Sequence, residues 1–167
     1  MELKIIPRSS DILPVNHNVT AVNYIECVSY NGQYRQYGKD KITPDLISKI
    51  LNDVPKGIEV SLCLDSDGEE YYGCMEVVSD GKWLSLCYGY EDTKTYFSYN
   101  PMFSDTVGQL KEMDLGDENV YTPIDYDGQS PIPKFQAITD MDAGVKAVRY
   151  FIYTGKLYPG IEWAYYL

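Results

Sequence analysis

Residues 58–90 read IEVSLCLDSDGEEYYGCMEVVSDGKWLSLCYGY, and this stretch decides the fold. Apolar and polar residues alternate along most of it, and a two-residue period is typical of β-strands. Asp67-Gly68 and Asp80-Gly81 divide the stretch into three runs, and Asp-Gly favours the tight turn of a β-hairpin. The stretch therefore predicts an antiparallel meander, which we expect a short strand at 95–99 to close.

Further strands are predicted on both sides of this meander. Residues 19–30 are moderately apolar on both faces, as a central strand is, and Asn31-Gly32 follows as a turn. Shorter strands are expected at 3–6 and at 160–167. Glycine and proline interrupt every period between residues 100 and 138, so only a short strand near 120–124 fits there.

Two segments carry the signature of an amphipathic helix. In residues 43–54, Thr43 is the predicted N-cap and Pro44 takes the first helical position. In residues 139–155, Thr139 begins a capping box and Gly155 suits the left-handed residue that ends a helix. Each segment has one apolar stripe, which predicts that each helix packs on the sheet.

The length of 167 residues and the hydrophobic fraction of 44% fit one globular domain over residues 1–167. The expected elements form an α+β domain. We predict a mostly antiparallel, twisted sheet of about six or seven strands, with two main helices packed on it.

The four cysteines, Cys27, Cys63, Cys74 and Cys87, fall in predicted strands and form no C-x-x-C pair. We therefore expect buried free thiols, and neither a zinc knuckle nor a thioredoxin-like motif. Residues 1–15 hold no apolar run of signal-peptide length, and no stretch approaches the length of a membrane span. These features predict a cytoplasmic protein that does not associate with membranes.

Few residues point to catalysis. His17 is the only histidine, and its Asn-His-Asn context favours a surface or capping role over a Ser-His-Asp or Cys-His device. Residues 65–69 resemble a calcium loop, but the glycine stands at the fourth position instead of the sixth, which favours a solvated turn. Phosphate-binding, dinucleotide-binding and nucleophile-elbow motifs are missing from the sequence. We expect no enzymatic activity, no cofactor and no metal ion.

The formal net charge is -11, from 25 acidic and 14 basic residues. This charge disfavours DNA, RNA and anionic lipid as partners and favours a basic protein. Within residues 105–127, acids and tyrosines are interleaved; acids steer a basic partner, and tyrosine rings anchor it. We predict that Asp114, Asp117, Glu118, Tyr121, Asp125, Tyr126 and Asp127 form a partner-binding site, with Glu91 and Asp92 as a second patch.

Residues 140–163 read DMDAGVKAVRYFIYTGKLYPGIEW. This segment resembles the closing signature of the first-numbered immunity family of bacterial polymorphic toxin systems. That signature is an amphipathic helix with alanines and an aromatic residue, then Thr-Gly, a proline and an aliphatic-x-Trp strand. The matching residues are Ala143, Ala147, Val148, Phe151, Thr154, Gly155, Pro159, Ile161 and Trp163.

Upstream, Asp127-Gly128 and Ile132-Pro133 resemble the family's glycine turn and the short extended segment after it. Two positions depart from the pattern. Ile138-Thr139 stands where a proline often opens the helix, and the proline after Thr-Gly is displaced by one residue.

The resemblance implies a cytoplasmic immunity protein that neutralises one cognate toxin domain of a secreted or contact-dependent system by occluding its active site. Some toxins of such systems act on nucleic acids and carry basic surface, which agrees with the charge of -11. The sequence leaves open two other hypotheses, a small carboxylate-dependent hydrolase or transferase and an acidic mimic of nucleic acid. It also leaves open the oligomeric state and the identity of the toxin.

Overall fold

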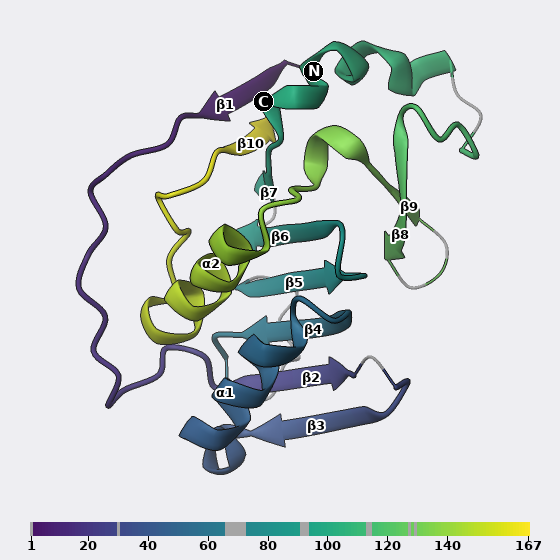
Figure 1. Ribbon diagram of the computed structural model, residues 1–167. Coiled ribbons are helices and arrows are strands. Elements are labelled where there is room, and N and C mark those ends of the chain that lie inside the picture. The colour runs from purple at the N-terminus through teal and green to yellow at the C-terminus, as the bar shows by residue number, and fades with distance from the viewer. Residues whose placement is uncertain are drawn as a thin grey trace.

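The computed structural model describes residues 2–29, 31–65, 73–90, 94–112, 115–126, 128 and 130–167. Within these residues the fold is α+β, as predicted, with an eight-stranded antiparallel sheet in the order β1-β10-β7-β6-β5-β4-β2-β3 (Figure 1). The strands of this sheet are β1 (Leu3–Ile6), β2 (Tyr24–Val28), β3 (Tyr34–Gly38), β4 (Ile58–Cys63), β5 (Cys74–Ser79), β6 (Leu84–Tyr90), β7 (Lys94–Ser98) and β10 (Trp163–Tyr166). A smaller sheet pairs β8 (Tyr121–Tyr126) with β9 (Ser130–Pro133).

The predicted meander is confirmed, because β4, β5, β6 and β7 are successive neighbours in the sheet. At the turn between β5 and β6, the Asp80 carboxylate accepts hydrogen bonds from the backbone N–H groups of Lys82 (2.9 Å) and Trp83 (2.8 Å). Gly81 has a φ of 89°, and a Cβ there would lie 2.8 Å from the Pro55 carbonyl oxygen. The turn therefore depends on glycine both for its conformation and for its close approach to the end of the first helix.

The strand count is higher than predicted because β3 and β9 lack an apolar period. β3 forms one edge of the large sheet, and most of its residues are exposed. β9 contains two prolines, which an edge strand tolerates since one side of it needs no ladder hydrogen bonds. Strands of this kind leave little signal in a hydrophobicity pattern.

Both predicted helices form. α1 (Pro44–Asp53) begins after Thr43, whose side chain accepts a hydrogen bond from the Leu46 N–H. α2 (Met141–Thr154) is capped by Asp140, one residue later than the predicted Thr139, and the Asp140 carboxylate accepts from the Ala143 N–H at 3.1 Å. Gly155 ends α2 in the left-handed conformation, with a φ of 69°.

The two helices cover the same face of the large sheet (Figure 1). The main core lies between the two helices and the large sheet, and it includes Leu86, Phe151 and Trp163. At Gly144, α2 approaches the sheet closely, since a Cβ there would lie 1.9 Å from Cδ2 of Leu84. Trp163 is buried, and its indole N–H donates to the Tyr158 carbonyl at 2.8 Å.

A second layer packs on the opposite face of the sheet. It consists of the small sheet, the 3-10 segment η2 (Pro101–Glu112), which has a kink at Phe103, and the short η3 (Lys134–Gln136). Apolar contacts join this layer to Val78 of β5, to Phe97 of β7 and to Ala164 of β10. The layer therefore covers the half of this face that runs from β5 to β1.

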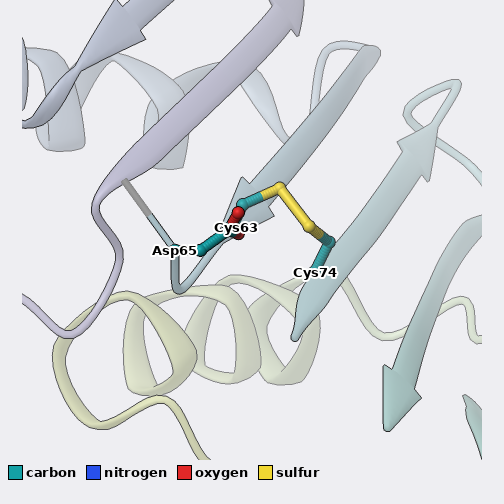
Figure 2. A group of neighbouring side chains, drawn as sticks. All are labelled: Cys63, Asp65 and Cys74. Carbon is teal, nitrogen blue, oxygen red and sulfur yellow. A yellow bond between two sulfur atoms is a disulfide. The ribbon is translucent and has the colours of Figure 1, made fainter. Parts of the chain in front are cut away.

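The cysteine prediction is wrong for one pair. Cys63 and Cys74 stand directly opposite each other in β4 and β5 and form a disulfide, with their Cα atoms 4.1 Å apart (Figure 2). Cys27 and Cys87 are free and partly buried, as expected. The predicted turn at Asp67-Gly68 lies outside the described residues.

Candidate protein-binding surface

The structure describes five of the nine residues predicted to bind a partner. Asp117 and Glu118 lie in the turn before β8, and Tyr121, Asp125 and Tyr126 lie on β8. The other four, Asp114, Asp127, Glu91 and Asp92, lie outside the described residues.

Two of these acids hold turns at the ends of β8. The Asp117 carboxylate accepts a hydrogen bond from the Asn119 N–H at 2.9 Å, and the Asp117 carbonyl accepts from the N–H groups of Val120 and Tyr121. The Asp125 carboxylate accepts from the Gly128 N–H at 2.7 Å. Glu118 is exposed. Asp117 and Asp125 therefore have local structural roles besides any role in binding.

Tyr126 faces the large sheet. It packs against the buried cluster that includes Val78 and Trp83, and its hydroxyl lies 2.9 Å from the Ser85 hydroxyl. Burial raises the pKa of Tyr126 well above its usual value, and burial also raises the pKa of the neighbouring Cys87 thiol to about 11. Tyr126 thus joins the two layers, and Tyr121 is also partly buried.

Tyrosines and acidic residues lie together on a different surface. The face of β3, β2 and β4 that points away from the helices is not part of the apolar clusters found among the described residues. We call this surface, together with Glu76 of β5, the open sheet face. The strand register places its polar residues on the same side of the sheet; they are Tyr24, Glu26, Tyr34, Gln36, Glu59, Ser61 and Glu76.

Hydrogen bonds order these side chains. The Tyr24 hydroxyl donates to the Glu26 carboxylate at 2.9 Å, and the Gln36 amide donates to the Tyr34 hydroxyl at 2.7 Å and to Glu26 at 3.4 Å. The Ser61 hydroxyl donates to the Glu76 carboxylate. Tyr34 as a whole remains 54% exposed. The face therefore combines a fixed polar network with an accessible aromatic ring.

The charge of the open sheet face is negative. Three glutamates lie on it, and the described positions of β2 to β5 on this face include no lysine, arginine or histidine. Among the described residues, Glu26 receives its hydrogen bonds from neutral donors and forms no salt bridge. Desolvation first, and then the Glu26 carboxylate, raise the pKa of Tyr24 to about 12.

Basic side chains gather elsewhere. His17 is exposed, its ring meets that of Tyr153 edge-on at 5.1 Å, and its imidazole contacts the Arg149 guanidinium. This arrangement fits the predicted surface role of His17. The same region of the N-terminal segment and α2 forms an open pocket lined by Ile12, Val15, His17, Lys146, Arg149, Tyr150 and Tyr158.

The sequence did not point to the open sheet face as a candidate surface, because the two faces of residues 19–30 looked alike in hydrophobicity and β3 was not predicted. The only signal was the Tyr-x-Glu alternation at 24 and 26, which becomes informative once β3 is known to pair with β2. The long acidic run at 105–127 carried more charge and therefore drew the prediction.

Comparisons of the chain with protein-family models, curated proteins and solved structures return no match. In the described part of the chain, the helices are too short or too polar to cross a membrane.

Proposed function

We propose that this chain is a non-catalytic immunity protein that binds a basic toxin domain through the open sheet face and occludes its active site. One observation carries the proposal. Tyr24, Glu26 and Tyr34 lie on the same face as two more glutamates, Glu59 and Glu76, and the described residues of that face include no basic side chain. The resemblance of residues 140–163 to an immunity family supports the same function. We propose the cytoplasm as the site of action and a nucleic-acid-targeting enzyme as the class of toxin.

The network on the open sheet face suits a cationic partner. Glu26 accepts hydrogen bonds from two neutral groups, Tyr24 and Gln36. A lysine or arginine of the partner would add a charge-assisted hydrogen bond, which is about twice as strong as a neutral one. Little reorganisation is needed, because the carboxylate is already held in place by its neighbours.

Tyr34 is the expected anchor. The residue is 54% exposed on the edge strand β3, and its hydroxyl already accepts a hydrogen bond from Gln36. Tyrosine contributes a large contact area for a small loss of conformational entropy, which is why it is common among residues that dominate binding energy. The net charge of -11 and exposed acids such as Glu118 would speed the encounter with a basic partner.

The test is capture of the toxin domain encoded beside this gene, followed by calorimetry at low and moderate salt and an assay of toxin activity. The proposal predicts tight 1:1 binding that weakens with salt and abolishes the activity. Tyr34→Ala is expected to weaken binding by roughly thirtyfold, as the loss of an anchor does. Met102→Ala is the matched control, since Met102 is 79% exposed and lies on the second layer.

Two results would contradict the proposal. One is the absence of binding to the neighbouring domain. The other is binding that leaves toxin activity intact, because occlusion of the active site would then be excluded.

A further inference from the structure

We propose that Cys63, Cys74 and Asp65 bind a zinc ion when the two cysteines are reduced, and that the disulfide prevents this binding. This departs from the sequence-based expectation of no metal ion. The argument for it does not use the proposed binding of a toxin, but the site adjoins the open sheet face, because Cys63 pairs with Tyr24.

The two cysteines are placed to act together. They occupy directly opposite positions of β4 and β5, with their Cα atoms 4.1 Å apart. One position further along, the Leu64 N–H donates to the Gly73 carbonyl at 3.0 Å, so the cysteines form a pair without ladder hydrogen bonds between them. Side chains at such pairs approach more closely than at hydrogen-bonded pairs. Both sulfur atoms therefore stay close together when the bond between them is broken.

Asp65 supplies a third ligand atom. It lies two residues after Cys63, and an oxygen of its carboxylate and the two sulfur atoms lie within 4.8 Å of one another (Figure 2). Asn23 fixes the chain here, because its N–H donates to the Cys63 carbonyl at 2.9 Å and its side-chain amide donates to the Leu64 carbonyl at 2.8 Å. The three groups thus converge from the end of β4 and the start of β5.

Reduction of the disulfide by a dithiol, followed by zinc binding, converts the oxidised form into the metal-bound form. A thiolate of a dithiol reductant attacks one sulfur of the disulfide, and the second thiol of the reductant then releases the mixed disulfide. Two electrons pass to the cysteines, and the reductant leaves as its own disulfide. Zn²⁺ then replaces the two thiol protons, which go to solvent, and the oxidation state of the metal does not change.

The spacing matches the needs of zinc. Two thiolates bound to zinc at about 2.3 Å in tetrahedral geometry lie roughly 3.8 Å apart, which facing strands provide with little movement. Cysteine thiolates with a carboxylate are an accepted donor set for zinc. Three protein ligands leave one coordination position for water or for a side chain of a binding partner. Reducing conditions such as those of the cytoplasm favour the dithiol form that this site requires.

The test uses the full chain, reduced and then freed of reductant without air. Co²⁺ is titrated into it while the sulfur-to-cobalt charge-transfer absorption is recorded, and Zn²⁺ is then added to displace the cobalt. We expect one equivalent of Co²⁺ to bind and Zn²⁺ to displace it, and we expect no binding to the oxidised protein. The oxidised form requires no substitution, so this comparison does not depend on a variant that folds.

Substitutions assign the ligands. Cys63→Ser and Cys74→Ser are each expected to abolish the charge-transfer absorption, and Asp65→Asn is expected to weaken Co²⁺ binding by about tenfold or more. Cys27→Ser and Cys87→Ser are matched controls, since both thiols are free and partly buried, and they should bind as the wild type does. No absorption in the reduced wild type, or an absorption that survives Cys63→Ser or Cys74→Ser, would overturn the site. An unchanged affinity in Asp65→Asn would overturn the role of Asp65.

Discussion

The Tyr24 hydroxyl donates a 2.9 Å hydrogen bond to the Glu26 carboxylate, two residues further along the same face of β2. Because of this hydrogen bond, the pKa of Tyr24 reports on the electrostatics of the open sheet face, and it can be measured without a binding partner. Desolvation and the Glu26 carboxylate together raise the pKa of Tyr24 to about 12.

Glu26→Gln should lower the pKa of Tyr24. Removal of the negative charge makes the phenolate less unfavourable, whereas the desolvation contribution remains. We expect a pKa below about 12 and still above the usual value of about 10. An NMR titration of the tyrosine ring signals measures it. If the titration curve of Tyr24 does not move, the carboxylate does not act on this hydroxyl.

Gly144→Ala should destabilise the fold. A methyl group there would lie 1.9 Å from Cδ2 of Leu84, and overpacking of this kind costs about 1–3 kcal/mol, more than the gain in helix propensity of about 1 kcal/mol. Urea unfolding measures the difference. Gly108→Ala is the control, because a Cβ at Gly108 meets no atom within 4 Å and stability should stay nearly constant. Equal stability of the two variants would mean that α2 does not pack so closely on β6.

Tyr126→Phe should cost about 1–2 kcal/mol at neutral pH, since it removes the partner of the buried Ser85 hydroxyl. The substitution should also change how the free energy of unfolding depends on pH above about 10. The folded pKa of Tyr126 lies well above 10, so the stability it contributes is fully present below about pH 10, the unfolded pKa, and is lost as the pH rises from there toward the folded pKa.

The phenylalanine variant lacks this titrating group. Its stability should therefore fall less steeply than that of the wild type above about pH 10. Urea unfolding at a series of alkaline pH values makes the comparison. Parallel curves for the two proteins would show that Tyr126 ionises equally in the folded and unfolded chains.

The double variant Cys63→Ser/Cys74→Ser should lose about 2–3 kcal/mol relative to the oxidised wild type, because the disulfide closes a loop between residues 11 apart in sequence. A reducing agent should lower the stability of the wild type by a similar amount and leave the variant unchanged. Guanidinium unfolding with and without reductant checks both. A variant that responds to reductant would mean that another pair of cysteines forms a bond.

The hydrophobic period and the Asp-Gly and helix-capping residues predicted the meander and both helices, because each of these signals is local. The register of the first hairpin was not accessible in the same way. A two-residue turn at Asp67-Gly68 would place Tyr72 opposite Cys63, whereas the observed register places Cys74 there, and the disulfide follows from that shift.

The candidate binding surface depends even more on tertiary structure. Tyr34 and Glu59 come from different strands, and only the register, which pairs both of them with Val28, places them on either side of β2. Tyr126 shows the reverse case. It stands among acids in the sequence, yet it packs against a buried cluster that includes Val78 of the large sheet. No local pattern distinguishes a ring that packs between layers from one that is exposed.

The central claim, that the open sheet face binds a basic toxin domain, is tested most directly by the rate of association at several salt concentrations. The comparison is between Glu26→Gln/Glu59→Gln and the control Asp11→Asn/Asp105→Asn, which removes the same charge from exposed acids on the N-terminal segment and the second layer. We predict that the first pair slows association by roughly threefold to tenfold and flattens its salt dependence, while the control changes the rate by less than about twofold. Equal effects of the two pairs would contradict the account, because net charge alone would then explain the steering.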